Sequence, residues 1–326
     1  MSTAISASEV RTDATRAHHI RFSHICVPAR DLEHSQRFFT EVLGGQLLEA
    51  GATTVRVHFG NLDIILGLQE RGATEPDREY PHYAFTLTPE LFLPLKRRLE
   101  AYGIPTHEPW TRSGFTHAIM YFRDPSGNQY EMYSDEGVPG IKLRVGHRAG
   151  GDYVVPFRQL VYQRLRDVPE NPDAIPRIPL LEFNHMTIPS KDLGQDKRFF
   201  AAIFDGKVTL DLPVHVTILV GGFDVGYGGP TDGGWPNPAD PYPRYGLEVP
   251  PDAMLLLKQR LTAFGIPTSE VWSSNGLDAS IFFRDPSSNL WEITCPRGFV
   301  GSVRREAGAG PDFAALGYTK WNDPGR

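Results

Sequence analysis

The sequence predicts an α+β protein made of two tandem copies of one domain, and three observations support this prediction. The stretch FSHICVPARDLEHSQRFFTEVLGG, from Phe22, matches FNHMTIPSKDLGQDKRFFAAIFDG, from Phe183, at an offset of 161 residues (183 minus 22). The stretches RLEAYGIPT and FRDPSGNQYEMY then recur, in the same order, as RLTAFGIPT and FRDPSSNLWEIT. Finally, a length of 326 residues suits about two domains. Ordered matches along two whole units indicate an internal duplication.

Each copy carries the same order of predicted elements. In the first copy, a strand over residues 23–28 precedes a helix over 31–42, with Asp31 as its N-cap. Two strands follow, joined by a turn at residues 60–61. A strand over 82–87 leads to a helix over 89–102 that Gly103 ends. Two more strands flank the turn sequence RDPSGN. Each copy therefore contains two βαβββ modules.

The predicted domain organisation has five parts. We expect a polar tail over residues 1–20, a first domain over 21–136, a linker over 137–180, a second domain over 181–299 and a C-terminal tail over 300–326. The linker predicts a helix at VPFRQLVYQRLRDV. The proline-rich run PENPDAIPRIP that follows suits a stiff boundary.

Composition and charge exclude several classes of partner. A net charge of −6 provides no basic surface for nucleic acid or an anionic membrane. No apolar run approaches the ~20 residues of a membrane span, and the polar N-terminus lacks the apolar core of a secretory signal. Cys26 and Cys295 do not form a disulfide framework. We therefore expect a cytoplasmic protein with no nucleic-acid or membrane partner, and we expect it to form a homo-oligomer.

Three sequence features resemble the vicinal oxygen chelate superfamily: a His on the first strand, a His on the fifth strand, and RDPSGNQYE at the last strand. The resemblance covers about residues 21–136 and 181–299. The superfamily includes glyoxalase I, fosfomycin-resistance thiol transferases, methylmalonyl-CoA epimerase and type I extradiol dioxygenases. Membership implies tandem domains, each with a curled mixed sheet that holds a divalent metal ion on its inner face. The matching ligand positions in the first copy are His24, His82 and Glu131.

The second copy differs at one of these ligand positions. It carries His185, Arg244 and Glu292. A guanidinium has no lone pair to offer, and its positive charge repels a metal ion. We therefore expect one metal ion per chain, held by the first copy, and an ion pair between Arg244 and Glu292 in the second.

Two comparisons with the superfamily bear on the reaction. Glyoxalase I and the epimerase resemble each other in using a fourth protein ligand, and the hairpin register puts Ile64, which cannot ligate, at that place. Extradiol dioxygenases typically carry a tyrosine ten residues before the carboxylate ligand. That residue is Tyr121 here, and Phe282 replaces it in the second copy.

The acid–base histidine of the extradiol enzymes has no direct match. Arg112, which we interpret as a solvated loop charge, stands at its expected place. His117 shares a strand face with Tyr121 by alternation. A near-neutral pKa would suit His117 to proton transfer.

Two imidazoles and one carboxylate with open positions are typical of non-haem Fe(II) oxygenases. The sequence therefore favours an Fe(II)-dependent extradiol-type dioxygenase that acts on a small aromatic diol, such as a catechol or hydroquinone, with O2. Mn(II) is the alternative metal. A glyoxalase-type or thiol-transferase-type enzyme stays open as an alternative, as does a non-catalytic protein of the superfamily that binds a small molecule.

Overall fold

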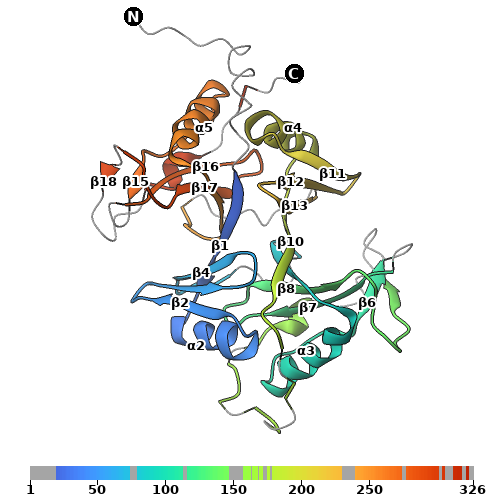
Figure 1. The fold of residues 1–326 in the computed structure, drawn as a ribbon. Coiled ribbons are helices and arrows are strands. Elements are labelled where there is room, and N and C mark those ends of the chain that lie inside the picture. The colour runs from blue at the N-terminus through green and yellow to red at the C-terminus, as the bar shows by residue number, and fades with distance from the viewer. Residues whose placement is uncertain are drawn as a thin grey trace, which may run out of the picture. The chain divides into compact units, whose positions relative to one another are not determined.

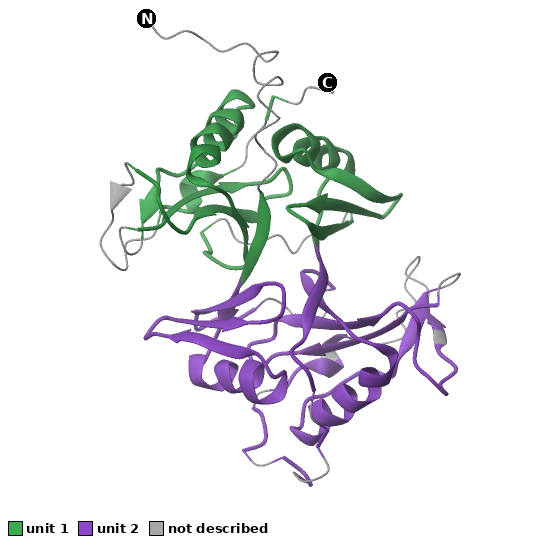
Figure 2. Ribbon diagram, viewed as in Figure 1, with its two compact units in different colours: residues 1–25, 188–326 green, residues 26–187 purple. Residues whose placement is uncertain are grey.

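The computed structural model describes residues 20–73, 79–112, 116–146, 157–162, 164–167, 169–171, 175–176, 178–229, 239–273, 277–300, 303–304, 311–317 and 321–322. The chain forms two compact units (Figure 2). Unit 1 comprises Met1–Ile25 and Ile188–Arg326, and unit 2 comprises Cys26–Thr187. The chain passes from one unit to the other inside strand β1 (Arg21–Ala29) and again inside strand β10 (Glu182–Pro189). Each of these two strands therefore contributes residues to both units.

Unit 2 contains mixed sheets together with helices (Figure 1). Its strands follow the order β10-β5-β8-β7-β6-β9 in one sheet and β1-β4-β3-β2 in another. The first sheet is mixed because β5 pairs with β8 in parallel and with β10 in antiparallel fashion. The elements are α2 (Leu32–Arg37) with its π-helical continuation η2 (Phe38–Val42), β2 (Gln46–Ala50), β3 (Thr54–His58), β4 (Asp63–Leu68), β5 (His82–Thr86), α3 (Pro89–Ala101), β6 (Trp110–Arg112), β7 (Ala118–Arg123), β8 (Gln129–Ser134), β9 (Arg144–Gly146) and the 3-10 turn η3 (Phe157–Leu160).

Unit 1 repeats this arrangement with the second set of modules. Its strands follow the order β18-β15-β16-β17-β14-β1 in one sheet and β11-β12-β13-β10 in another. The elements are α4 (Leu193–Phe204), β11 (Lys207–Leu212), β12 (His215–Val220), β13 (Phe223–Gly228), β14 (Arg244–Glu248), α5 (Pro251–Ala263), β15 (Trp272–Ser273), β16 (Ala279–Arg284), β17 (Leu290–Cys295), β18 (Val303–Arg304) and the 3-10 turn η5 (Ala314–Leu316). The predicted α+β class, the repeated modules and the curled mixed sheets are confirmed. No helix in the described part of the chain is long and apolar enough to cross a membrane.

Local sequence signals explain where the helices begin and end. The Asp31 carboxylate accepts a hydrogen bond from the backbone N–H of His34, 3.0 Å away, which confirms it as an N-cap. Asp192 does the same for Gln195 at the start of α4. Gly103 follows α3 with a φ of +79°, a conformation that glycine adopts without strain.

The predicted linker does not behave as a separate segment. Residues 137–180 belong to unit 2, and the units divide inside β1 and β10 instead of at the predicted domain ends. The α-helix predicted over residues 155–168 is wrong, because the described part of this stretch forms only the 3-10 turn Phe157–Leu160. The backbone N–H of Leu165 instead donates to Nε2 of His34, which anchors the chain against α2. Most of the predicted polar tail, residues 1–19, lies outside the described residues.

Unit 1 buries two carboxyl groups, those of Asp196 and Asp285. Asp196 is fully buried near Asp285, and its Oδ2 accepts hydrogen bonds from Ser190 (2.6 Å) and Ser287 (2.7 Å). Burial, and then the charge of Asp285, raise the pKa of Asp196 well above its usual value. The first copy has Ser35 at the position of Asp196. The folded state therefore disfavours the ionised form of Asp196.

A neutral isostere at Asp196 should alter how stability depends on pH. Because the folded state raises the pKa of Asp196, its contribution to stability is complete below about pH 4 and declines as the pH rises toward the folded pKa, by at most ~1.4 kcal/mol per pH unit. Asp196→Asn should therefore flatten the fall of the thermal midpoint above pH 4, as measured by calorimetry. Asp211→Asn, an exposed change, is the control. Parallel pH curves for the parent and Asp196→Asn would contradict the assignment.

Candidate metal centre

Three adjacent strands of unit 2 bring His82, Glu131 and His185 together. Ala84 of β5 pairs with His185 of β10 on one side and with Glu131 of β8 on the other. Paired residues direct their side chains to the same face of a sheet, and so do residues two apart on one strand. His82 lies two residues before Ala84, so the three side chains share one face.

The potential ligand atoms of this cluster converge. His82 Nε2 lies 3.2 Å from Glu131 Oε2, and His185 Nε2 lies 3.9 Å from the same oxygen. All three atoms lie within 4.8 Å of one another. The side chains of His82 and Glu131 are each 1% exposed, whereas that of His185 is 21% exposed. Any approach from solvent is therefore easier at His185.

The hydrogen bonds of the two imidazoles leave both Nε2 atoms free to ligate. His82 donates from Nδ1 to the backbone carbonyl of Glu79, 3.1 Å away. His185 donates from Nδ1 to the Asn184 side-chain oxygen, 2.6 Å away. A neutral imidazole that donates from Nδ1 carries its lone pair on Nε2. Metal-binding histidines are oriented by bonds of this kind.

Burial keeps the two imidazoles neutral. It lowers the pKa of His82 and that of His185 to about 3. It also raises the pKa of Glu131 to about 7, against the opposing effects of Arg112 and Tyr121. His82 Nε2 and Glu131 Oε2 have no hydrogen-bond partner among the described residues, and leaving such a group unpaired costs about 1–3 kcal/mol. A proton shared between these two atoms would relieve one contact, whereas a divalent ion would satisfy all three ligand atoms. The residues therefore fit a metal ion.

The structure brings together two of the three predicted ligands. His82 and Glu131 lie together as predicted, but the third member of the group is His185 and not His24. The physical reason is the course of the chain: His24 lies in the part of β1 that belongs to unit 1, and His185 lies in the part of β10 that belongs to unit 2.

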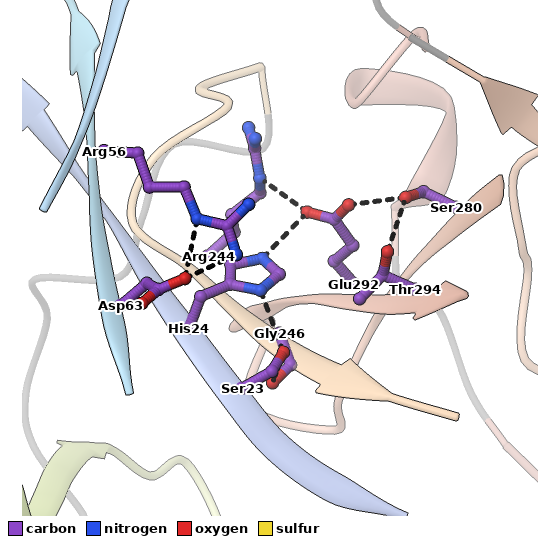
Figure 3. Close-up of polar contacts among 9 residues, drawn as sticks. All are labelled: Ser23, His24, Arg56, Asp63, Arg244, Gly246, Ser280, Glu292 and Thr294. Carbon is purple, nitrogen blue, oxygen red and sulfur yellow. Dashed lines mark hydrogen bonds and ion pairs between the residues drawn. The ribbon is translucent and has the colours of Figure 1, made fainter. Parts of the chain in front are cut away.

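His24 takes part in an ion-paired cluster in unit 1 (Figure 3). Its Nε2 lies 3.4 Å from Glu292 Oε2, which also accepts a hydrogen bond from Arg244 Nε at 3.0 Å. Ser280 donates to the other carboxylate oxygen at 2.6 Å, and Ser23 Oγ lies 2.9 Å from His24 Nδ1. The predicted ion pair between Arg244 and Glu292 is confirmed.

The pKa of Glu292 is shifted in the opposite direction to that of Glu131. Burial alone would raise the pKa of Glu292, but the charge of Arg244 and the hydrogen bond to His24 more than offset it and leave that pKa well below its usual value. Glu292 is therefore ionised and already paired. The guanidinium of Arg244 already supplies this carboxylate with a positive charge.

Tyr121 lies where the sequence predicted. It pairs with Glu131 across β7 and β8, and its ring lies 5.4 Å from that of His82. Burial, and then the charge of Glu131, raise its pKa well above the usual value, so it stays a hydrogen-bond donor. In unit 1 the same place is taken by Phe282, which pairs with Glu292.

The surroundings of His117 do not favour the near-neutral pKa expected from the sequence. Burial, and then the charge of Arg112, lower the pKa of His117 to about 4. Its ring lies 5.5 Å from that of Tyr133, which in turn lies 5.6 Å from that of His185. His117 is therefore a neutral imidazole, separated from the ligands by one aromatic ring.

Ile64 does not decide the number of protein ligands. The predicted hairpin register is confirmed, since Val57 pairs with Ile64. However, β4 lies in the sheet β1-β4-β3-β2 of unit 2, and the cluster lies in the sheet that contains β10, β5 and β8. Among the described His, Cys, Asp and Glu residues, no fourth side chain joins the cluster.

Sequence reasoning missed two residues of this region. His107 is 4% exposed, its ring nitrogens have no hydrogen-bond partner among the described residues, and its ring lies 6.1 Å from that of Tyr121. Arg112, predicted to be a solvated charge, acts electrostatically on Glu131 and on the two histidine ligands. The available signal was the comparison of the two copies, because Ser269 and Ser274 replace these residues in the second.

Comparison with known proteins relates the chain to one superfamily. Residues 21–132 match the family described as Glyoxalase/Bleomycin resistance protein/Dioxygenase superfamily. Glutathione transferase FosA of Serratia marcescens is 34% identical over 113 residues, which cover 34% of this chain and 78% of the relative. Metallothiol transferase FosB of Staphylococcus epidermidis is 30% identical over 114 residues, which cover 34% of this chain and 80% of the relative. A variant of glyoxalase I from Zea mays superposes with a TM-score of 0.59 at 15% identity, over 89% of this chain and 97% of that chain. That likeness shows the fold alone.

Removal of either histidine ligand should abolish tight metal binding. We expect His185→Ala, like His82→Ala, to lose the one bound divalent ion per chain, because each change removes one of three ligands. His24→Ala is the matched control, since it alters the equivalent strand position in the other copy and should keep the ion. Plasma emission analysis after reconstitution measures the content, and circular dichroism checks folding. Retention of the ion by His185→Ala together with its loss from His24→Ala would restore the ligand set first predicted.

Proposed function

The chain belongs to the glyoxalase/bleomycin resistance protein/dioxygenase superfamily, and on that basis we propose that it is a metal-dependent enzyme. His82, Glu131 and His185 hold a divalent ion that binds a small, oxygen-bearing substrate. The observation that carries this proposal is the convergence of two neutral imidazoles and one carboxylate, with His82 Nε2 and Glu131 Oε2 unpaired among the described residues.

The reaction that this ligand set favours is extradiol cleavage of an aromatic diol by O2. Two histidines and one carboxylate are the ligands of non-haem Fe(II) oxygenases. When bound, the ion would supply coordination positions for the diol and O2 and polarise the bonds that react. Both oxygen atoms of O2 enter the ring-opened product, so no external reductant is needed. Mn(II) is the alternative ion.

The neighbouring residues have roles that suit this reaction. Tyr121 keeps its proton and lies beside Glu131 and His82, so it can donate a hydrogen bond to a substrate oxygen. His117 stays the proposed acid–base residue, but its neutral imidazole lies beyond the Tyr133 ring from His185, so it would exchange a proton with the substrate only indirectly.

Thiol transfer is the second candidate, and the similarity to FosA and FosB favours it. In this reaction a thiolate sulfur attacks an epoxide carbon, the carbon–oxygen bond breaks, and the resulting alkoxide takes up a proton. The same three ligands would hold the ion that polarises the epoxide oxygen. Tyr121 would then stabilise the alkoxide by hydrogen bonding.

Oxygen uptake separates the two candidates. Protein purified without air and loaded with Fe(II) should consume one O2 per molecule of catechol or hydroquinone and yield a ring-opened product. In parallel, Mn(II)-loaded protein is given glutathione and an epoxide, and loss of the thiol is followed. Thiol consumption without O2 uptake would overturn ring cleavage in favour of transfer. A protein that binds diols but performs neither reaction would point to the non-catalytic alternative.

Loss of the Tyr121 hydroxyl should slow turnover without removing the metal. Tyr121→Phe places in the first copy the residue that the second carries at 282. Removal of a donor to the reacting oxygen costs about 10²–10⁴-fold in rate. Phe282→Tyr is the reciprocal control and should leave the rate unchanged. A Tyr121→Phe enzyme with full metal content and the parent rate would exclude this role.

A further inference from the structure

Gln129 lies next to two residues of the metal centre. In β8 it precedes Glu131 by two residues, so the two side chains share one face of the sheet. In the parallel pairing of β5 with β8 it is the partner of His82. The residue is 2% exposed. A buried amide needs partners for its oxygen and for its nitrogen, and these partners indicate what Gln129 does.

The Gln129 amide forms a hydrogen bond at each end. Its Nε2 donates to the backbone carbonyl of Glu79, 3.0 Å away, and its Oε1 accepts from Nη2 of Arg123 at 2.9 Å. A guanidinium only donates and a carbonyl only accepts, so the two partners fix which end of the amide faces which. Arg123 is held in turn, because its Nη1 donates to the carbonyl of Gly127. The amide therefore has one defined orientation.

The Glu79 carbonyl is shared with a metal ligand. It accepts from His82 Nδ1 at 3.1 Å as well as from Gln129, and a carbonyl oxygen has two lone pairs for such bonds. Residues 79–81 lie outside the strands and helices, so no ladder of sheet hydrogen bonds fixes that oxygen. Gln129 ties it to β8, the strand that also carries Glu131.

The orientation of the His82 ring depends on this oxygen. While Nδ1–H donates to it, the lone pair of Nε2 stays available on the side of Glu131 Oε2, 3.2 Å away. If the carbonyl were displaced, the ring would be free to turn or to carry its proton on Nε2 instead. A partner that fixes the tautomer and the ring of a metal-binding histidine raises its affinity for the ion.

The second repeat lacks the amide. Leu290 stands in the place of Gln129 and pairs with Arg244, the residue that replaces His82. Leu290 is 1% exposed, so an apolar side chain fills this buried place in unit 1. The amide therefore occurs in the copy that has the histidine and not in the copy that lacks it. A residue needed only to complete the core would have no reason to follow that histidine.

We propose that Gln129 is a positioning residue, which holds the His82 ring in place for the metal ion through the Glu79 carbonyl. The inference rests on the proposed function and assigns a supporting residue to the same site. Gln129 does not contact the ion itself. It fixes the oxygen that keeps the proton on Nδ1, and loss of such a partner typically lowers metal affinity about 10–100-fold.

The first measurement is the affinity for Mn(II), followed by electron paramagnetic resonance of the free ion. Gln129→Leu, which introduces the residue that the second repeat carries at 290, should weaken binding about 10–100-fold. Gln129→Met, which keeps the length of the side chain but has no hydrogen-bonding amide, should weaken it to a similar extent. Gln46→Leu, an exposed change in β2, is the control and should bind Mn(II) as the parent does.

The second measurement is the tautomer of His82 in the metal-free protein. Nuclear magnetic resonance of protein with ¹⁵N-labelled histidine reports it, and His82→Ala identifies the signal. The parent should carry the proton on Nδ1, whereas both Gln129 variants should show a mixture of the two tautomers. A side chain that served only packing would change the thermal midpoint of the metal-free protein and leave the tautomer as it is.

The binding of Mn(II) by the parent separates the two levels of the proposal. If the parent holds the ion and the Gln129 variants bind it as tightly, or keep the parent tautomer, the role of Gln129 alone is overturned. A loss of affinity in Gln129→Leu that Gln129→Met does not share would assign the effect to packing and overturn it too. A parent protein that holds no ion after reconstitution would overturn the proposed function and this inference with it.

Discussion

Two neutral imidazoles and a carboxylate direct their free atoms at one another in the interior of unit 2, and the properties of the site depend on that contact. Each imidazole donates from Nδ1, to Glu79 or to Asn184, and so cannot turn a proton toward Glu131 without breaking a bond. Burial disfavours protonation of either ring. A cation placed between the three atoms would give each of them a partner, and this is why the site suits a metal ion.

In unit 1 the corresponding carboxylate, Glu292, is stabilised by protein side chains. There the guanidinium of Arg244 pairs with Glu292, and Ser280 satisfies the second oxygen of that carboxylate. The carboxylate is stabilised in its ionised form by a covalently attached cation. The same strand arrangement thus holds a built-in cation in one unit and an open set of ligands in the other.

The duplication has a direct consequence for the centre in unit 2. Its histidines come from both repeats, since His82 belongs to the first and His185 to the second. One repeat alone cannot supply the full set. The residues that surround these ligands, Tyr121, His107 and Arg112, all come from the first repeat and are replaced in the second. Both repeats are therefore needed for one site, and the first determines its chemical character.

The sequence by itself determined the duplication, the order of the elements, the helix caps, and the positions of His82, Glu131 and Tyr121. Local signals encode these features: a repeat offset, turn residues and alternation along a strand. Only the tertiary structure decided that His185 completes the centre, because His24 and His185 occupy the same place in their repeats and differ only in the unit that their strand segments enter. The low pKa of His117 and the course of the chain at Leu165 likewise depend on burial and on hydrogen bonds with residues distant in sequence. No local pattern encodes such contacts.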